Sequence, residues 1–572
     1  MTESPSGICL AFVRRTRFVA LISAAAMLVV MLPDRGYAVA KAKEDYFSIT
    51  RSVDLLGDVY KVVSENYVDP VNVSELMLSG IDGMLDRLDP YTDLLDEAQS
   101  NELDEITSGQ YAGIGITIGI ISGDLYITSL IDGQAASKAG LMVGDRISAV
   151  NGTRVSHKSI DDVRGLIKGP AGSTVTLSVM RDGEGRARIF TLKRAEVRVS
   201  TIPYSGLFDS VGYVELNSFG EHSKEELRTA LQSLQGLAEK EHVSLKGMVL
   251  DLRGNPGGLL TSAVDVAALF VAKGSRVVST KGSSAESEQV FVTKGEPLVP
   301  SLPLVVMIDG DSASASEIVA GAIQELDRGV ILGEGSYGKG LVQSVIALPY
   351  DHMLKLTTAK YYTPSGRLIQ KPLVHPSDSH RKVLAGVGAT DSTKVYYTHN
   401  RRKVYGGGGI KPDITSRAAS LSGYELAMEK NGIFFRYASR FHAKHPEFQA
   451  QQVLSVPLFD DFSRFVESEH FTYRSKPQQG LDSLKAFVRK DGGQDGDPLV
   501  AKLDLLEKEL GAWSLTRIAR DSTRITSILK REILRHYDER AAKRSAIEAD
   551  PVATRAFTLL NDPKSYKALL RP

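Results

Sequence analysis

The segment Asp311–Gln343, DSASASEIVAGAIQELDRGVILGEGSYGKGLVQ, is the most informative part of the chain. The apolar run Leu304–Ile308 comes just before it and predicts a buried strand. Alternating serines and alanines follow, and a helix is expected over Ser316–Leu326. Small residues allow a sharp turn and a close substrate, and a helix N-terminus offers free N–H groups for an oxyanion. This order predicts an α/β core with a reactive loop between strand and helix.

Three serines occupy the loop, at Ser312, Ser314 and Ser316. Serines are also common helix caps, and this ordinary role is expected for Ser316. Lys339 lies between two glycines downstream, and no histidine is near it. A buried lysine can be neutral and can then take the proton of a serine hydroxyl. The alternative role for Lys339 is that of an exposed turn residue.

Gln343 lies four residues beyond Lys339, in the expected strand 341–349, so that both side chains point to one face. A competing interpretation is a phosphate-binding loop, because Gly333–Lys339 has the spacing G-x-x-x-x-G-K. However, Gly340 occupies the Ser/Thr position, and a strand rather than a helix is expected next. The sequence therefore disfavours nucleotide binding.

Composition excludes several functional classes. Lys plus Arg and Asp plus Glu each number 69, so no basic excess favours nucleic acid as a partner. The single cysteine, Cys9, excludes a disulfide framework and a cysteine-rich zinc site. The 11 histidines form no H-E-x-x-H pair. We therefore expect neither a metal nor a cofactor.

The N-terminus resembles a secretory signal peptide. Arg14, Arg15 and Arg17 precede the uncharged run Phe18–Leu32, and the small-x-small sequence Ala38-Val39-Ala40 follows. We expect residues 1–40 to direct export to the periplasm or cell envelope. The alternative is an uncleaved membrane anchor, which needs about 20 apolar residues.

The rest of the chain divides into four regions of a multidomain α/β protein. Residues 41–106 have helical periodicity, with breaks at Asp69-Pro70 and Asp89-Pro90, and residues 416–572 are helical and charged. Residues 107–196 are β-rich, and 197–415 alternate strands with helices. The strands expected in the β-rich region are Ile114–Ile118, Leu125–Leu130, Arg146–Val150 and Thr174–Met180, with a helix over Ser159–Ile167. The strands expected in the α/β region include Val211–Leu216, Met248–Leu252 and Val330–Leu332, with helices over Lys224–Glu239 and Leu260–Val271.

The segment quoted first resembles the catalytic core of the carboxyl-terminal processing proteases, also called tail-specific proteases. SASASE at Ser312–Glu317 and YGKGLVQ at Tyr337–Gln343 match the two motifs of that family. In the family the catalytic serine lies 25 residues before the lysine, a spacing that selects Ser314. The resemblance implies a triad of Ser314, Lys339 and Gln343.

Other segments extend this resemblance. DLRGNPGG at Asp251–Gly258 is similar to the glycine loop of the family, which implies an oxyanion hole formed by the Ala315 amide and an amide of Gly257 or Gly258. Further matching segments are LDPYT at Leu88–Thr92, YTPSGR at Tyr362–Arg367 and GGGGIKPD at Gly406–Asp413.

Residues 108–195 resemble a PDZ domain, with YAGIGITIG at Tyr111–Gly119 as its carboxylate-binding loop. Backbone amides in such a loop can hold a C-terminal carboxylate while the peptide adds a strand to the sheet. The resemblance implies substrate binding at Gly113, Ile114, Gly115 and Ile116. An ordinary hairpin is the alternative for this glycine loop.

These features predict an exported serine endopeptidase with a Ser–Lys dyad. It would bind apolar C-termini of protein or peptide substrates through the PDZ domain and would need no metal, cofactor or nucleic acid. An uncleaved N-terminal segment would make it membrane-associated, and a homo-oligomer is compatible with the sequence. The rival hypothesis is a catalytically inactive envelope scaffold that binds protein C-termini. The intact set of Ser314, Lys339 and Gln343 disfavours that rival.

Overall fold

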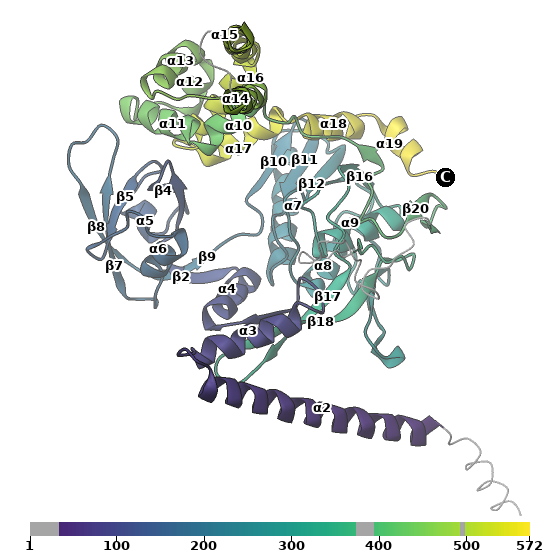
Figure 1. Ribbon diagram of the computed structural model, residues 1–572. Helices are drawn as coiled ribbons and strands as arrows, with labels where there is room; N and C mark the ends of the chain where they lie inside the picture. The colour runs from purple at the N-terminus through teal and green to yellow at the C-terminus, as the bar shows by residue number, and fades with distance from the viewer. Residues whose placement is uncertain (1–33, 373–393, 492–497) are drawn as a thin grey trace, which may run out of the picture. The chain divides into compact units, whose positions relative to one another are not determined.

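The computed structural model describes residues 34–372, 394–491 and 498–572, in two units that divide after Leu88 (Figure 1). In the first unit, α2 (Asp34–Asn66) and α3 (Val73–Leu85) are separated at the predicted Asp69-Pro70 break. Most of the predicted signal peptide, residues 1–33, lies outside the described residues. Within those residues, no helix combines the length and apolarity needed to cross a bilayer.

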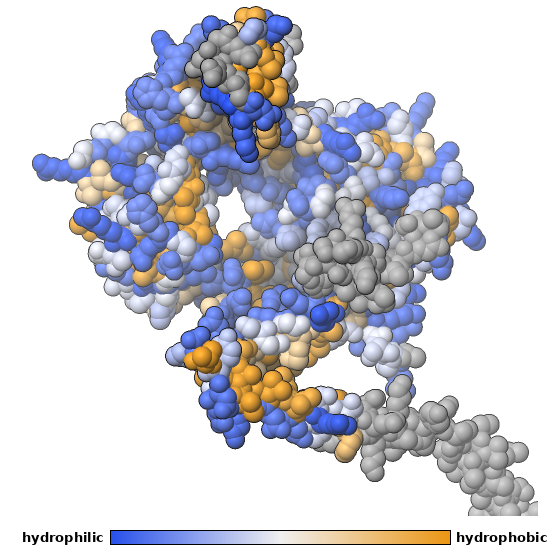
Figure 2. Space-filling model, viewed as in Figure 1, coloured by the Kyte–Doolittle hydropathy of each residue, from blue (hydrophilic) through white to orange (hydrophobic). Residues whose placement is uncertain are grey.

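The first unit leaves many apolar side chains exposed. On α2 these include Phe47, Val53, Leu55 and Val59, and α3 buries none of its residues. Figure 2 shows an orange area over these helices. The predicted amphipathic helices therefore form, but their apolar side chains are not covered within this unit.

The PDZ-like region contains a sheet in the order β3-β4-β5-β7-β8, with β6 beside β5. Three of the four expected strands match within one residue. The expected strand Ile114–Ile118 is wrong at its start: β3 begins at Ile116, because Gly115 turns the chain with a φ of +78°. The elements are β2 (Gln110–Gly113), β3 (Ile116–Ile121), β4 (Asp124–Leu130), α5 (Ala135–Lys138), β5 (Arg146–Val150), β6 (Thr153–Arg154), α6 (Ile160–Ile167), β7 (Thr174–Met180), β8 (Arg188–Lys193) and β9 (Ala195–Arg198).

A six-stranded sheet forms the centre of the α/β region, in the order β10-β11-β12-β15-β16-β21. From β11 to β21 all neighbours are parallel, as the alternation of strands and helices predicts. The strands are β10 (Tyr204–Phe208), β11 (Val211–Glu215), β12 (Gly247–Asp251), β15 (Leu304–Ile308), β16 (Val330–Gly333) and β21 (Ile414–Thr415). Helices α7 (Ser223–Lys240), α8 (Leu260–Ala267) and α9 (Ala315–Glu325) pack on it in one large core. Helix α8 ends four residues before the predicted Val271, and the Phe270 carbonyl accepts a hydrogen bond from Arg328 instead.

The last helices of the chain pack against the same central sheet. These are α17 (Glu539–Glu548), α18 (Pro551–Leu560) and α19 (Pro563–Leu569). Ile547, Val552 and Leu560 share a second core with sheet residues such as Val249 and Val305, and Figure 1 shows α18 beside the sheet. The end of the predicted helical extension thus forms a layer of the α/β core.

A second sheet has the order β1-β18-β13-β14, with β17 also paired to β18. Its strands are β1 (Asp93–Leu95), β13 (Arg276–Lys281), β14 (Gln289–Val292), β17 (Leu341–Ala347) and β18 (Met353–Tyr362). Strand β1 lies inside a region predicted to be helical, because pairing with the distant β18 decides its conformation. A short helix, α4 (Glu97–Ser108), follows it.

The remaining described elements lie after these sheets or in their loops. A helical cluster around Phe434, Phe462 and Leu529 accounts for most of the predicted C-terminal extension. Its helices are α10 (Gly423–Lys430), α11 (Ile433–Lys444), α12 (Ala450–Ser455), α13 (Phe459–Ser468) and α16 (Ser522–Leu534). Two further helices of this region are α14 (Lys476–Lys490) and α15 (Pro498–Arg520). The smaller elements are a 3₁₀ turn (Ala285–Ser287) and the hairpin of β19 (Val395–Tyr397) with β20 (Lys403–Tyr405).

Candidate active site

Ser314 occupies the turn between β15 and α9 in an unusual backbone conformation. Its φ of +55° and ψ of −112° lie outside the regions that non-glycine residues normally adopt. Its amide donates to Glu317 Oε2 at 2.9 Å, and its carbonyl accepts from Glu317 N and Ile318 N. Such strain costs on the order of 1–3 kcal/mol and is concentrated at functional sites.

The three serines of the loop have different surroundings. Ser312 and Ser316 are fully buried, and their hydroxyls donate to the carbonyls of Leu252 at 2.8 Å and Asn255 at 2.9 Å. Ser314 is the one of the three that keeps part of its surface exposed. Its hydroxyl is therefore the most accessible to a substrate. The helix cap expected at Ser316 lies instead at Ser314.

Lys339 and Gln343 are in direct contact and face the same side, as their spacing predicts. Lys339 Nζ donates to Gln343 Oε1 at 2.9 Å, although Lys339 lies in the loop before β17 rather than in the strand. Gln343 Nε2 donates to the carbonyl of Tyr91 at 2.6 Å. Because the amide nitrogen is paired with a carbonyl, the amide oxygen is left facing the lysine. The glutamine thus orients the Lys339 side chain.

Burial lowers the pKa of Lys339 from its ordinary value, and the like charge of Lys355 lowers it further. The negative charges of Asp89 and Glu317 oppose this shift but do not cancel it. The Tyr91 ring covers the amine, with Lys339 Nζ 4.5 Å from the ring centroid. Tyr91 therefore contributes both an acceptor for Gln343 and part of the burial.

Glu317 connects the serine loop to the lysine loop, a role that sequence reasoning missed although Glu317 lies within the SASASE motif. Its carboxylate is buried and accepts from the amides of Ser314 and Lys339, both at 2.9 Å from Oε2. Oε1 accepts from the Ser336 hydroxyl at 2.5 Å and from Gly338 N at 2.7 Å. One carboxylate thus positions the backbone of both candidate catalytic residues.

The pKa of Glu317 is raised to about 7, chiefly because burial penalises the charged form. The four hydrogen bonds favour the carboxylate and limit this shift. The Tyr361 hydroxyl also joins the two loops, donating at 2.6 Å to the Lys339 carbonyl and at 3.2 Å to that of Ser314.

The glycine loop Asp251–Gly258 contacts the serine loop. A Cβ placed on Gly257, whose φ is +106°, would lie 2.8 Å from Ser314 Cβ and 2.9 Å from the Ala315 nitrogen. Only glycine therefore allows this approach. The Gly257 amide itself donates to Asn255 Oδ1 at 2.9 Å. The oxyanion role of Gly257 and Ala315 stays a prediction, and the geometry brings both next to Ser314.

Three family models match this chain. Residues 210–379 match peptidase family S41, residues 126–181 a PDZ domain, and residues 424–560 the C-terminal helical domain of probable PDZ-proteases. The carboxy-terminal-processing protease of Bartonella bacilliformis is 36% identical over 353 residues, which cover 62% of this chain and 79% of that protein. The chain belongs to the carboxy-terminal processing protease family.

Another relative is the carboxy-terminal processing protease CtpB of Bacillus subtilis, 32% identical over 331 residues, 57% of this chain and 67% of that protein. Among solved structures, the photosystem II D1 C-terminal processing protease aligns with 26% identity and a TM-score of 0.33. That alignment covers 63% of this chain and 92% of that protein. The predicted family and the predicted fold class are confirmed, and the chain is a peptidase.

The PDZ domain of this family member has a groove where the sequence places the carboxylate-binding loop. Residues 113–118, which include Gly113, Ile114, Gly115 and Ile116, line a cavity of about 260 Å³ together with α4 and α6. Lys168 pairs with Glu105 at this groove, and its Nζ lies 5.4 Å from the centroid of the Tyr111 ring. The four residues therefore share one cavity, and their binding role remains a prediction.

Proposed function

We propose that this protein is an exported serine peptidase in which Ser314 is the nucleophile and Lys339 the general base. The partly buried Lys339–Gln343 contact carries the proposal, because it joins a lysine of lowered pKa to a glutamine that fixes its direction. The partly exposed Ser314 on a strained turn supports the same assignment. A neutral lysine beside a serine is a known variant of the catalytic triad.

The reaction proceeds in two halves. Ser314 Oγ attacks the carbonyl carbon of the scissile bond as its proton passes to neutral Lys339 Nζ. The oxyanion accepts hydrogen bonds from the amide of Ala315 and from that of Gly257, which exchanges its Asn255 Oδ1 acceptor for the oxyanion. The Lys339 ammonium then donates its proton to the leaving amine, and an acyl-enzyme on Ser314 remains. Water, deprotonated by Lys339, releases the second product and restores the serine.

The nucleophile is tested with the variant Ser314→Ala and the matched variant Ser312→Ala. Ser314→Ala should lose activity by several orders of magnitude and resist labelling by a fluorophosphonate probe. Ser312→Ala should still be labelled, because its hydroxyl is buried against a carbonyl. Labelling of the Ser314→Ala protein at wild-type rate would disprove the assignment.

The PDZ groove and the N-terminal sequence extend the proposal to substrate and location. Residues Gly113–Ile116 hold the free C-terminus of an apolar substrate tail through backbone amides. Residues 1–40 direct export to the periplasm or cell envelope. Cell fractionation of the full chain and of a chain lacking residues 1–40 tests the location: recovery of both in the cytoplasm would contradict it.

A further inference from the structure

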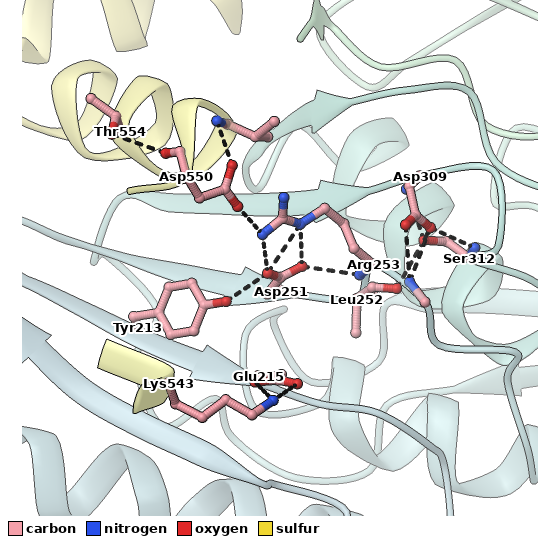
Figure 3. Close-up of polar contacts among 12 residues, drawn as sticks. Tyr213, Glu215, Asp251, Leu252, Arg253, Asp309, Ser312, Lys543, Asp550 and Thr554 are labelled. Carbon is pink, nitrogen blue, oxygen red and sulfur yellow. Dashed lines mark hydrogen bonds and ion pairs between the residues drawn. The ribbon is translucent and has the colours of Figure 1, made fainter. Parts of the chain in front are cut away.

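The carboxyl end of β12 carries a partly buried ion-pair network that reaches the last helices of the chain (Figure 3). Asp251, the last residue of β12, is 4% exposed and accepts from the Tyr213 hydroxyl at 2.6 Å. The Arg253 guanidinium donates to the same carboxylate, at 2.7 Å to Oδ2 and at 3.0 Å to Oδ1. Arg253 is therefore held on one side by its own strand end.

A second carboxylate holds Arg253 from the other side. Asp550 Oδ2 lies 2.6 Å from an Arg253 terminal nitrogen, while Asp550 Oδ1 accepts from Val552 N at 2.8 Å and caps α18. Burial alone would lower the pKa of Arg253, but Asp251 and Asp550 outweigh burial and raise it. The guanidinium fork has fixed geometry, so two carboxylates determine its orientation better than one.

Arg253 lies in the glycine loop, and the two residues after it hold the chain on both sides of Ser314. Gly254 N donates to Asp309 Oδ1 at 3.0 Å, and the same carboxylate accepts from Ser312 N and Ser312 Oγ, both at 3.1 Å. The Asn255 carbonyl accepts from Ala313 N at 3.0 Å and Ser316 Oγ at 2.9 Å. The position of Arg253 is thereby connected to the residues that flank Ser314.

Helix α18 is a firm support for this contact. Val552, Ala553 and Ala556 are buried against the central sheet, so the cap at Asp550 is anchored by packing on the sheet that carries Arg253. An ion pair between two packed elements holds a position more strictly than one between flexible surface side chains.

We propose that Asp550 is a positioning residue of the peptidase, which holds the glycine loop against the serine loop through Arg253. Ser314 and the oxyanion amides thereby keep the relative positions that the reaction requires. The C-terminal helices are then part of the catalytic apparatus and not only an appendage. This inference rests on the proposed function, since it assumes that Ser314 is the nucleophile.

The test compares Asp550→Asn with two control variants in the full chain. Asparagine keeps an oxygen that can cap α18 but removes the charge that holds Arg253. Lys543→Gln breaks another ion pair between these helices and the sheet, with Glu215 at 2.8 Å. Asp562→Asn alters the equivalent cap of α19, where Asp562 Oδ1 accepts from Lys564 N at 3.1 Å.

Three quantities are measured: the rate of Ser314 labelling by a fluorophosphonate, kcat and KM for a short peptide, and Tm. We expect Asp550→Asn to lower the labelling rate and kcat by roughly tenfold, because small displacements of reacting groups are costly. KM and Tm should match those of the controls, and Asp550→Glu should recover part of the rate. In an Arg253→Met background, which has no cation to pair with residue 550, Asp550→Asn should have no added effect.

Two results would overturn the inference. A labelling rate for Asp550→Asn equal to that of the controls would reduce Asp550 to an ordinary helix cap. A full additional loss in the Arg253→Met background would show that Asp550 does not act through Arg253. Failure of the wild-type protein to label at all would instead disprove the proposed nucleophile, and the inference with it.

Discussion

Charged side chains have different environments in the loops around Ser314 and in the groove of the PDZ domain. Glu317 is buried and Lys339 is half-buried, and their pKa values move toward neutrality because desolvation outweighs their hydrogen bonds and neighbouring charges. Lys168 and Glu105, at the groove, each keep about three tenths of their side chains exposed and form an ion pair. Changes to a desolvated charge have large, pH-dependent effects on activity and stability. An ion pair in contact with solvent stabilises the folded protein by only about 0–1 kcal/mol.

The largest expected effect is the loss of kcat when Lys339, in the loops around Ser314, is replaced. Lys339→Arg keeps a positive charge but cannot deprotonate near neutral pH. We expect it to be as inactive as Lys339→Ala, with kcat lowered by about 10³-fold or more for every substrate. Wild-type kcat should rise with pH through the lowered pKa of Lys339, as stopped assays from pH 5 to 9 can measure.

A control for this prediction is Lys355→Arg, which preserves the neighbouring charge that lowers the Lys339 pKa. Its pH profile should follow that of the wild type. Substantial turnover by Lys339→Arg would leave the lysine only an electrostatic role.

The next effect concerns Glu317. A glutamine there offers an NH₂ group where one carboxylate oxygen now accepts the amide hydrogens of Ser314 and Lys339, or where the other accepts from the Ser336 hydroxyl and the Gly338 amide. We expect kcat of Glu317→Gln to fall by roughly 10- to 100-fold, because the two loops lose their common acceptor. Exposed Glu239→Gln serves as the matched control and should keep wild-type kcat.

Glu317 also makes a prediction for stability. Its pKa rises from 4.5 to about 7 on folding, so the native state binds this proton more tightly than the unfolded state. The wild-type free energy of unfolding, relative to Glu317→Gln, should therefore fall between pH 4.5 and 7, by about 3 kcal/mol in all, and level off above pH 7. Urea unfolding at pH 5 and pH 8 measures it. If the difference in free energy of unfolding between the two proteins is the same at both pH values, folding does not raise the pKa of Glu317.

A smaller effect is expected at the PDZ groove. Amidating the C-terminus of a folded reporter removes the charge that the Gly113–Ile116 amides would hold, and an Asp tail removes the apolar contact. Either change should lower kcat/KM by about tenfold, equivalent to about 1.4 kcal/mol. A short peptide that does not reach the groove should show no such preference. Equal cleavage of free-acid, amidated and Asp-tailed reporters would rule out tail recognition.

The smallest expected effect concerns the Lys168–Glu105 ion pair at the PDZ groove. Glu105→Gln leaves Lys168 without its carboxylate, so the groove becomes more positive and should bind an anionic tail about twofold more tightly. Lys168→Gln should weaken the same binding to a similar extent. Fluorescence anisotropy with a labelled tail peptide measures both in the Ser314→Ala protein. If both variants changed the affinity for the tail peptide in the same direction, the charges of this ion pair would not determine tail binding.

Apolar runs and residue spacing in the sequence made much of the fold predictable. Strand β15 matches the apolar run at Leu304–Ile308, and α9 matches the expected helix within one residue at each end. The i, i+4 spacing of Lys339 and Gln343 predicted that their side chains share one face, whereas their contact also requires the loop conformation of Lys339. These features follow from hydrophobic periodicity and from spacing along a single strand or helix.

Other features depend on residues far apart in the chain. The helical texture before residue 106 did not reveal β1, because its conformation follows from pairing with β18. Nor did the SASASE motif reveal that Glu317 would accept hydrogen bonds from two loops. Such a carboxylate is recognisable only when its partners are known.

The sequence by itself pointed to the residues of the proposed chemistry: a serine on a small-residue turn, a lysine between glycines and a glutamine four residues later. Tertiary structure decided their environment. The Tyr91 ring covers Lys339 from 248 residues away, and Asp550 holds Arg253 from the last helices of the chain. The physical reason is that burial and charge pairing depend on neighbours in space, whereas a sequence pattern specifies only neighbours along the chain.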